Sequence, residues 1–164
     1  MRRDAVGELY QRYAPMVYKY LLCLSRDKGL AEDLTADTFE AALRGIGRFR
    51  QEAQISVWLC AIAKRLYYQE LRRRGKVKQV ALDEQTLISE TDIEKEYADK
   101  EERMDFYRLL QTLDRETREV FYLRMTGGMT FDEIGDIMGR SGSWARVTFY
   151  RGKEKLKRRL SDGE

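Results

Sequence analysis

The sequence predicts an all-α protein built from two small helical domains, which are joined by an acidic flexible linker. Three observations lead to this prediction: the composition, the distribution of charge along the chain, and the helical spacing of the apolar residues. The chain has 164 residues with one Pro and 12 Gly, and helix-forming Leu, Ala, Glu, Lys and Arg are plentiful. A chain of this length forms one ordinary domain or two small ones.

The composition also excludes several classes of function. The net charge of +3 by itself neither indicates nor excludes a nucleic-acid partner. There is no histidine, so catalysis by imidazole is excluded and a zinc site would need carboxylates among its ligands. No apolar run reaches the roughly 18 residues of a membrane span, and the N-terminus lacks the apolar stretch of a secretory signal. We expect Cys23 and Cys60 to be small core residues in a reducing cytoplasm, and a redox role for either stays open.

Charge is unevenly distributed, and this predicts the domain boundaries. Residues 1–82 carry 16 basic and 9 acidic side chains, whereas residues 83–105 carry 3 basic and 10 acidic ones. Residues 83–96 show no sustained helical or strand period, which is typical of a linker; a solvated surface helix is the alternative. The expected organisation is a first domain over 1–78, an acidic linker over 79–104 and a second domain over 105–164.

Three or four helices are predicted in the first half. Pro15 lies inside the apolar pattern of the first helix and should kink that helix or split it. Asp27 can cap the second helix, and Gly45 and Gly47 should end it. The third helix finishes in Arg72–Gly75, where three cations precede the glycine, as the helix dipole prefers.

The second half carries the pattern of a helix-turn-helix. Thr130 and Glu133 have the spacing of a capping box at a helix start, and Gly139 suits the residue that follows that helix. Ser141 can cap the next helix. The apolar face of this last helix is formed by Ala145, Phe149, Gly152 and Leu156. A short helix, a Gly-bearing turn of about three residues and a longer helix are the helix-turn-helix plan.

The other faces of this last helix carry cations, small donors and aromatic rings, as a helix that enters the major groove of DNA needs. A basic surface helix in a bundle is the alternative interpretation. The candidate DNA-contacting residues of this segment are Arg140, Ser141, Ser143, Trp144, Arg146, Val147, Tyr150 and Arg151.

The helix before this motif is expected to be enclosed. Val120, Phe121, Leu123 and Met125 cannot all share one face of a helix. We therefore expect the helix that contains them to be buried on two sides.

A second candidate nucleic-acid surface lies in the first half. Cations and flat rings together suit an unstacked single strand. The loop before the third helix and the helix itself offer Arg50, Gln51, Gln54, Trp58, Lys64, Arg65, Tyr67 and Tyr68. Core packing is the alternative for Trp58, and because Tyr67 and Tyr68 are adjacent, at most one of them faces the core.

A row of carboxylates lies on one face of the second predicted helix. Asp33, Asp37 and Glu40 recur at i, i+4 and i+7, so they share a side of the helix. Such a row repels itself by a few tenths of a kcal/mol per pair. It would also repel DNA, but it suits a basic protein partner. A solvated helix face is the alternative.

Taken in order, these motifs resemble the bacterial sigma-70 family, specifically its small extracytoplasmic-function (ECF, group four) members. The resemblance covers nearly all of residues 1–160. The segments that carry it are Ala31–Phe39 (AEDLTADTF), Phe49-Arg50 with Trp58-Leu59 and Ile62–Lys64, Leu71–Arg73, Leu113–Arg115, Arg118–Val120, Glu133–Gly135 and Arg151–Lys153.

The resemblance implies a non-enzymatic, cofactor-free and dissociable subunit that gives RNA polymerase its promoter specificity. The first domain would bind the clamp helices of the largest polymerase subunit and melt the minus-ten element. The second would bind the flap of the neighbouring subunit and read the minus-thirty-five element. The resemblance also implies a cytoplasmic location, no direct membrane insertion, and an anti-sigma factor, often anchored in the membrane, that holds the protein inactive.

Three other classes of function compete with this one. The main alternative is a helix-turn-helix regulator that binds duplex DNA without being a polymerase subunit, because the second half alone does not exclude it. An enzyme is disfavoured, since the sequence has no P-loop, no GxSxG motif and no metal-ligand cluster. A helical adaptor that binds only protein would not need a cation-rich recognition helix.

Overall fold

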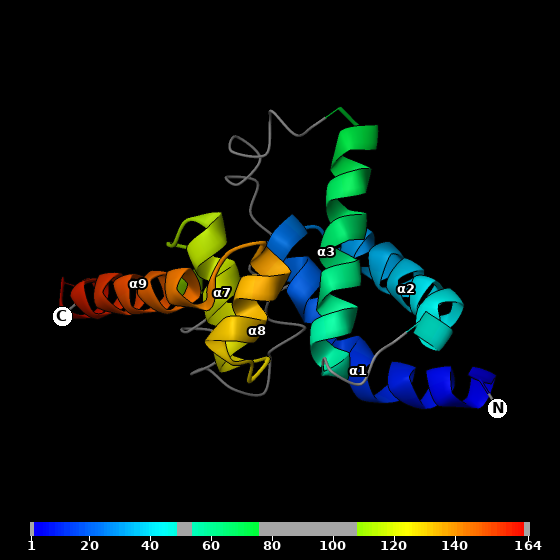
Figure 1. The fold of residues 1–164 in the computed structure, drawn as a ribbon. Coiled ribbons are helices and arrows are strands. Elements are labelled where there is room, and N and C mark those ends of the chain that lie inside the picture. Colours follow the sequence, from blue (N-terminus) through cyan, green and yellow to red (C-terminus); the bar gives the residue numbers. More distant parts are fainter. Residues whose placement is uncertain (1, 49–53, 76–107, 163–164) are drawn as a thin grey trace. The chain divides into compact units, whose positions relative to one another are not determined.

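The computed structural model describes residues 2–48, 54–75 and 108–162. Every regular element within these ranges is a helix (Figure 1). The chain divides into two compact units, Met1–Leu87 and Ile88–Glu164. The predicted all-α class and the two helical units are therefore confirmed.

The predicted domain ends and the linker between them lie outside the described residues. The expected boundaries at 78/79 and 104/105, and the whole of 79–104, fall within 76–107. These boundaries stay predictions.

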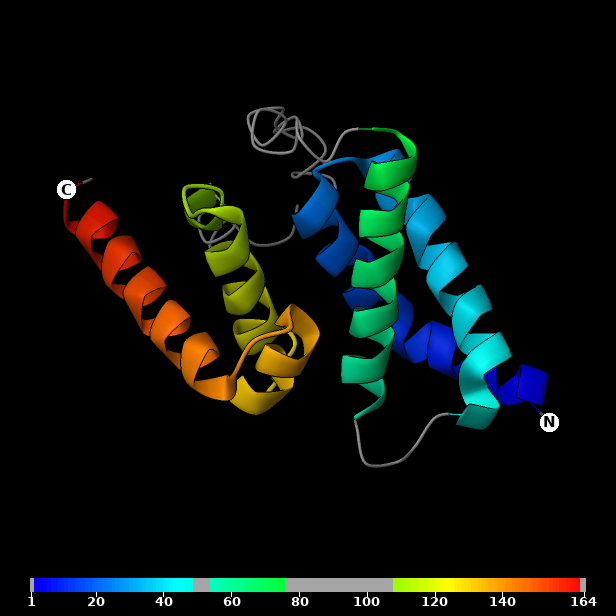
Figure 2. The ribbon, with the colours of Figure 1, turned by 45° about the horizontal axis from the view of Figure 1, so that its top comes forward.

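In the described part of the first unit, three α-helices form a bundle. α1 spans Arg2–Ser25, α2 spans Lys28–Gly45, and α3 spans Ile55–Arg73, with a short 3-10 helix over Ile46–Arg48. Each of the three α-helices contacts the other two. Figures 1 and 2 show α2 (cyan) and α3 (green) side by side, with α1 (blue) running across them. This arrangement leaves α2 and α3 each with one side toward solvent.

Of the two outcomes predicted for Pro15, a kink or a split of the first helix, the split does not occur. α1 is one helix that continues through Pro15, and Figure 1 shows α1 changing direction along its length. Pro15 and Gln11 are both exposed. The Gln11 carbonyl, which loses its amide donor at Pro15, therefore lies on the side that water reaches. The missing hydrogen bond can therefore be made to water, and the helix continues through Pro15 without breaking.

Small residues on α2 let the helices of the first unit approach closely. Ala31 and Ala42 are completely buried. The buried hydroxyls of Thr35 and Thr38 donate to the carbonyls of Ala31 and Leu34, each at 2.7 Å. Their polar groups are thus satisfied within the helix, and burying them costs little.

The helix ends of the first unit follow local chemistry, with one exception. The Asp27 carboxylate accepts a hydrogen bond from the Leu30 amide at 3.1 Å, which confirms the predicted cap. Gly75 follows the last turn of α3 with a φ of +68°. This is the left-handed conformation that a glycine commonly adopts just after the end of a helix. α2 ends at Gly45, as predicted, but the chain then passes through Ile46 in the right-handed conformation into the 3-10 helix that contains Gly47. Gly45 is therefore not a left-handed cap.

The second unit contains α7 (Arg115–Met125), α8 (Phe131–Met138) and α9 (Gly142–Asp162), preceded by helical turns from Arg108. Seven consecutive residues of α7, from Thr117 to Leu123, are buried. This confirms that the helix is enclosed on more than one side. Met125 does not share in that burial and is 58% exposed, because it is the last residue of the helix and lies beyond the packed turns.

A glycine sets the distance between α7 and α9. A Cβ atom on Gly152 would lie 2.6 Å from Phe121 Cε2 and 2.6 Å from Thr117 Cγ2. Any side chain here would displace the Phe121 ring and the Thr117 methyl group or push the helices apart. Next to this crossing, the rings of Phe121 and Phe149 stack with centroids 4.5 Å apart.

Candidate nucleic-acid interface

The helix-turn-helix forms as the sequence predicts. The Glu133 amide donates to Thr130 Oγ1 at 3.1 Å, and the Thr130 amide donates to a Glu133 carboxylate oxygen at 2.8 Å. Gly139 has φ +67 and ends α8. The Trp144 amide donates to Ser141 Oγ at 3.0 Å, which caps α9. Three residues, 139–141, thus join a helix of eight residues to one of 21 residues.

A second glycine permits the tight turn, and sequence reasoning missed it. A Cβ atom on Gly135 would lie 2.7 Å from the carbonyl oxygen of Arg140. The Arg140 amide in turn donates to the Gly135 carbonyl at 2.8 Å. Gly135 stands in the middle of a helix, where a glycine lowers helix propensity, so only the folded turn reveals its role.

The structure gathers most of the predicted DNA-contacting residues on one side of α9. The buried positions of α9 form a stripe on the opposite side. At 3.6 residues per turn the exposed positions follow each other along the helix. The exposed candidates are Arg140, Ser141, Ser143, Arg146, Val147, Tyr150 and Arg151. Two of them present apolar surface, since Val147 is 46% and Tyr150 is 51% exposed.

Trp144 differs from the other candidates because it is half-buried. The Arg140 guanidinium carbon lies 5.1 Å from the centroid of the Trp144 ring, a cation–π distance. Arg140 also lies 3.6 Å from a carboxylate oxygen of Glu116 in α7. Trp144 and Arg140 thus connect the start of α9 to the rest of the unit, and the indole offers only part of its surface.

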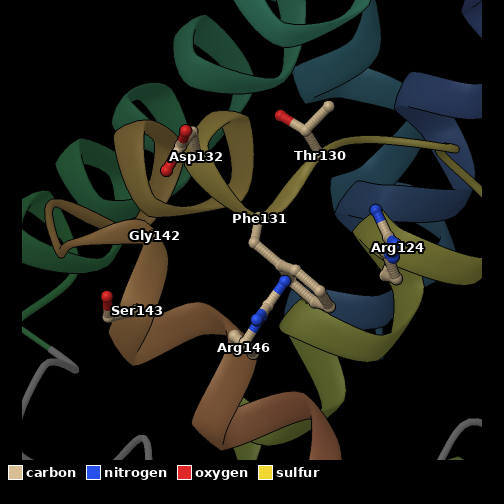
Figure 3. Close-up of a pocket in the computed structure, with 7 residues that line it drawn as sticks. All are labelled: Arg124, Thr130, Phe131, Asp132, Gly142, Ser143 and Arg146. Carbon is tan, nitrogen blue, oxygen red and sulfur yellow. The ribbon is translucent and has the colours of Figure 1, made fainter.

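A pocket of about 420 Å³ opens at the start of α9 (Figure 3). Three helices contribute to its wall, and the two helix starts meet there. The residues that line it are Arg124, Thr130, Phe131, Asp132, Gly142, Ser143 and Arg146. Arg124 was missed by sequence reasoning, because α7 carries no basic pattern at this point and the fold alone brings its end to the pocket.

The candidate single-strand surface of the first unit is partly described. Arg50 and Gln51 lie outside the described residues. Gln54, Trp58, Arg65 and Tyr68 follow one side of α3 at helical spacing, with Lys64 at its margin. Gln54 and Arg65 are exposed, and Trp58, Lys64 and Tyr68 are half-buried. The structure therefore brings these five together.

Tyr67 occupies a core position instead. It is 4% exposed, and its hydroxyl donates to the Leu24 carbonyl of α1 at 3.2 Å. Its ring lies 5.2 Å from that of Tyr68, edge to face. The prediction that at most one of the two tyrosines faces the core is confirmed, and Tyr67 is that one. We therefore remove Tyr67 from the candidate surface.

The ring positions on α3 are fixed by neighbours. The Lys64 ammonium lies 5.3 Å from the centroid of the Tyr68 ring. The indole of Trp58 packs against the end of α2, with its Cζ2 atom 3.7 Å from where a Cβ on Gly45 would stand. Both rings keep some exposed surface. Stacking on an unpaired base needs an ordered ring with exposed surface of this kind.

The three carboxylates of α2 share an exposed side, as expected. Asp33, Asp37 and Glu40 are all exposed. Glu40 lies 3.4 Å from Arg44, with both side chains more than half exposed, so this pair contributes less than about 1 kcal/mol. The row keeps its negative charge toward solvent.

Two further features bear on the classes of function. Within the described residues, no three His, Cys, Asp or Glu side chains are placed to hold a metal ion. Among the same residues, no helix combines the length and the apolar character that crossing a bilayer demands.

Comparison with known proteins gives consistent matches. The model of sigma-70 region 2 matches residues 9–77, and that of sigma-70 region 4 matches residues 103–156. RNA polymerase sigma factor CarQ of Myxococcus xanthus is 33% identical over 162 residues, which cover 99% of this chain and 92% of CarQ. ECF RNA polymerase sigma factor BldN of Streptomyces coelicolor is 30% identical, over 97% of this chain and 61% of BldN.

A solved structure shares the fold. The sigma factor RpoE from Bartonella quintana, crystallised with the anti-sigma factor NepR, aligns with a TM-score of 0.69. The alignment has 19% sequence identity and covers 94% of this chain and 96% of the RpoE chain.

Proposed function

Because this chain belongs to the sigma-70 family as an ECF-type factor, which binds core RNA polymerase and directs promoter-specific initiation, we propose that its two units divide this work. The first unit contacts polymerase and the minus-ten element, and the second reads the minus-thirty-five element. The domain ends proposed for this division are 78 and 105.

The single observation that carries the proposal is the exposed side of α9. Its core-facing stripe is buried against α7 and α8, so only the side with Ser143, Arg146, Tyr150 and Arg151 can meet a duplex. A capped helix of this length that presents cations and small donors fits the major groove. We propose that Arg146 and Arg151 contact base edges or phosphates there.

The exposed side of α3 fits a single strand better than a duplex. Trp58 and Tyr68 are partly exposed aromatic rings on which unpaired bases can stack, while Lys64 and Arg65 supply positive charge for the nucleic-acid backbone. We propose that this side holds the melted minus-ten element.

The acidic side of α2 supports a protein partner. Asp33, Asp37 and Glu40 would repel a nucleic acid, whereas a basic surface on polymerase would neutralise them. We propose that they bind the clamp helices of the largest subunit, and that the second unit binds the flap.

An anti-sigma factor is a further proposed partner. The RpoE protein of similar fold is bound to the anti-sigma factor NepR. We propose that this chain, too, is held inactive by an anti-sigma factor, with both acting in the cytoplasm where polymerase is found. Sigma factors are non-catalytic initiation factors, and we assign this chain no enzymatic activity and no cofactor.

Run-off transcription with purified core polymerase on a library of genomic promoter fragments tests the proposal. We expect transcripts only when the chain is added, from promoters that share two short elements. The regulator alternative predicts tight, sequence-specific duplex binding by the chain alone and no transcripts in this assay, and that outcome would overturn the division of labour proposed here.

A further inference from the structure

The ring of Phe131 lies beside guanidinium groups from two other helices. The guanidinium carbon of Arg124, at the end of α7, is 4.2 Å from the ring centroid, and that of Arg146, on α9, is 5.6 Å from it. Both distances are in the cation–π range. Figure 3 shows Phe131 pointing from the start of α8 toward these two side chains. The aromatic residue thus connects α7, α8 and α9 at the mouth of the pocket.

Phe131 is itself held by its surroundings. Its centroid lies 5.6 Å from that of Phe149 and 6.2 Å from that of Tyr150. The capping box at Thr130 and Glu133 fixes the backbone one residue before it. The ring is half-buried, so part of it packs on the core and part remains for the arginines.

The two arginines stand in different situations. Arg124 is half-buried, and its Nη1 donates to the Met129 carbonyl at 2.8 Å, so it has a structural partner besides the ring. Arg146 is exposed on the proposed DNA side of α9. A long exposed side chain loses rotamer freedom when it binds, and ordering it beforehand reduces that loss.

We infer that Phe131 is a positioning residue for DNA recognition: its ring orders the Arg146 guanidinium at the pocket mouth before DNA arrives. This inference rests on the proposed function of α9 as the helix that reads duplex DNA. Phe131 itself need not touch DNA. Its contribution passes through Arg146, and Arg151 provides the matched comparison, since it lies on the same exposed side and within the described residues has no aromatic contact.

A double-mutant cycle tests the inference in the full chain assembled with core polymerase. The probe is a labelled duplex enriched from a random-sequence library by the wild-type assembly. Phe131→Leu should weaken binding about two- to fivefold, the size of an exposed cation–π contact, and Phe131→Tyr should restore it. The slope of log affinity against log salt should not change with Phe131→Leu, because the number of neutralised phosphates stays the same.

The cycle separates positioning from a structural role. Once Arg146→Ala is present, adding Phe131→Leu should cost no further affinity, whereas in the Arg151→Ala background it should cost the same two- to fivefold. An equal loss from Phe131→Leu in both backgrounds overturns the positioning role and leaves the proposed function standing. If Arg146→Ala and Arg151→Ala both leave affinity and the enriched sequence unchanged, the proposed function of α9 fails instead.

A measurement on the wild-type chain avoids any folding defect of Phe131→Leu. In its NMR spectrum, the Arg146 Nε–H proton should be shifted upfield by the Phe131 ring relative to that of Arg151, and its order should exceed that of Arg151. Equal shifts and equal order for the two side chains would overturn the inference.

Discussion

Cys60 is completely buried in the core of the first unit. Burial raises the pKa of its thiol to about 12, because the thiolate would lose its hydration in the apolar interior. Cys23 is also buried, and both cysteines are free thiols. Reactive and redox-sensing cysteines need an accessible thiolate, so these side chains suit packing better than sensing.

The Cys60 thiol should therefore react with an aromatic disulfide reagent at pH 8 only as fast as the first unit unfolds. Its contribution to stability is full below the unfolded pKa near 9.0 and is lost as pH rises from there toward 12, since the unfolded state ionises first. Reaction of the native chain is followed by absorbance, with the denatured chain as control. Rapid labelling of Cys60 in the native chain at pH 8 would contradict this.

Glu70 is the most strongly shifted carboxylate among the described residues. Arg73 Nε donates to it at 3.0 Å and Arg74 Nε at 2.7 Å. The hydrogen bond from Arg73 and then that from Arg74 lower the pKa of Glu70 to about 2. This cluster holds two of the three arginines at the end of α3.

We expect the Glu70 carboxylate to titrate near pH 2 when its side-chain carbon signal is followed by NMR. Because the pKa is lowered from 4.5, the contribution of Glu70 to stability is present above that value and is lost as pH falls toward 2. In Glu70→Gln, this part of the pH dependence should disappear and the last turn of α3 should exchange its amides faster. A midpoint near 4.5 in the wild type would show that the two hydrogen bonds do not persist in solution.

Helix ends were the part of the fold most open to prediction from sequence. Asp27, Thr130 with Glu133, and Ser141 all cap as expected, because a cap depends on residues within three positions of each other. The four buried positions of α9 were also predicted in full, since apolar residues repeated at the helical period of 3.6 residues leave one side of the helix for the core.

Features that depend on neighbouring elements could not be predicted in this way. Arg118 is completely buried in α7, and its Nη1 donates to the Leu113 carbonyl at 3.5 Å. Charged residues usually lie at the surface. The burial of Arg118 therefore could not be expected from its residue type and depends on how α7 packs in the folded unit. The sequence did not show which of Tyr67 and Tyr68 faces the core. It also did not show that Arg124 lines the pocket, because the folded chain brings the end of α7 next to the starts of α8 and α9.

Gly152 gives a prediction at the crossing of α7 and α9. An alanine gains about 1 kcal/mol of helix propensity over glycine. Its Cβ would meet Phe121 and Thr117 at 2.6 Å, however, and overpacking of this kind costs about 1–3 kcal/mol. Gly152→Ala should therefore lower the free energy of unfolding of the second unit, as measured by denaturant titration of the full chain.

Gly7→Ala is the matched control for this change. Gly7 is an exposed residue of α1, and a Cβ atom at this position would have no neighbouring atom within 4 Å, so only the propensity gain should remain. If Gly152→Ala stabilises the chain as much as Gly7→Ala does, the close approach of α7 and α9 does not constrain the second unit.

The first unit presents two surfaces of opposite character on adjacent helices. The row of carboxylates lies on α2, whereas the basic and aromatic side chains lie on α3. These two helices pack against each other. A single small bundle can therefore hold a basic protein with one side and a nucleic acid with another. This suits a subunit that must bring polymerase and promoter together, whereas a regulator that acts alone would not need the acidic side.

The acidic row provides the test that separates these two interpretations. The double change Asp37→Arg, Glu40→Arg should leave the fold intact, because both side chains are exposed and the Glu40–Arg44 pair is worth less than about 1 kcal/mol. It should weaken association with core polymerase by about tenfold or more, since juxtaposed like charges at an interface cost several kcal/mol. Duplex binding through α9 should not change.

The measurement is a titration of labelled chain with core polymerase, beside circular dichroism of each variant. Glu8→Arg with Asp162→Arg is the control, since both acids are exposed, lie outside α2 and change the net charge by the same amount. If this control weakened polymerase binding as much as Asp37→Arg with Glu40→Arg does, the loss of affinity would come from the total charge and not from the acidic side of α2. Wild-type affinity in a folded Asp37→Arg, Glu40→Arg chain would remove α2 from the interface and favour a regulator that meets DNA unaided.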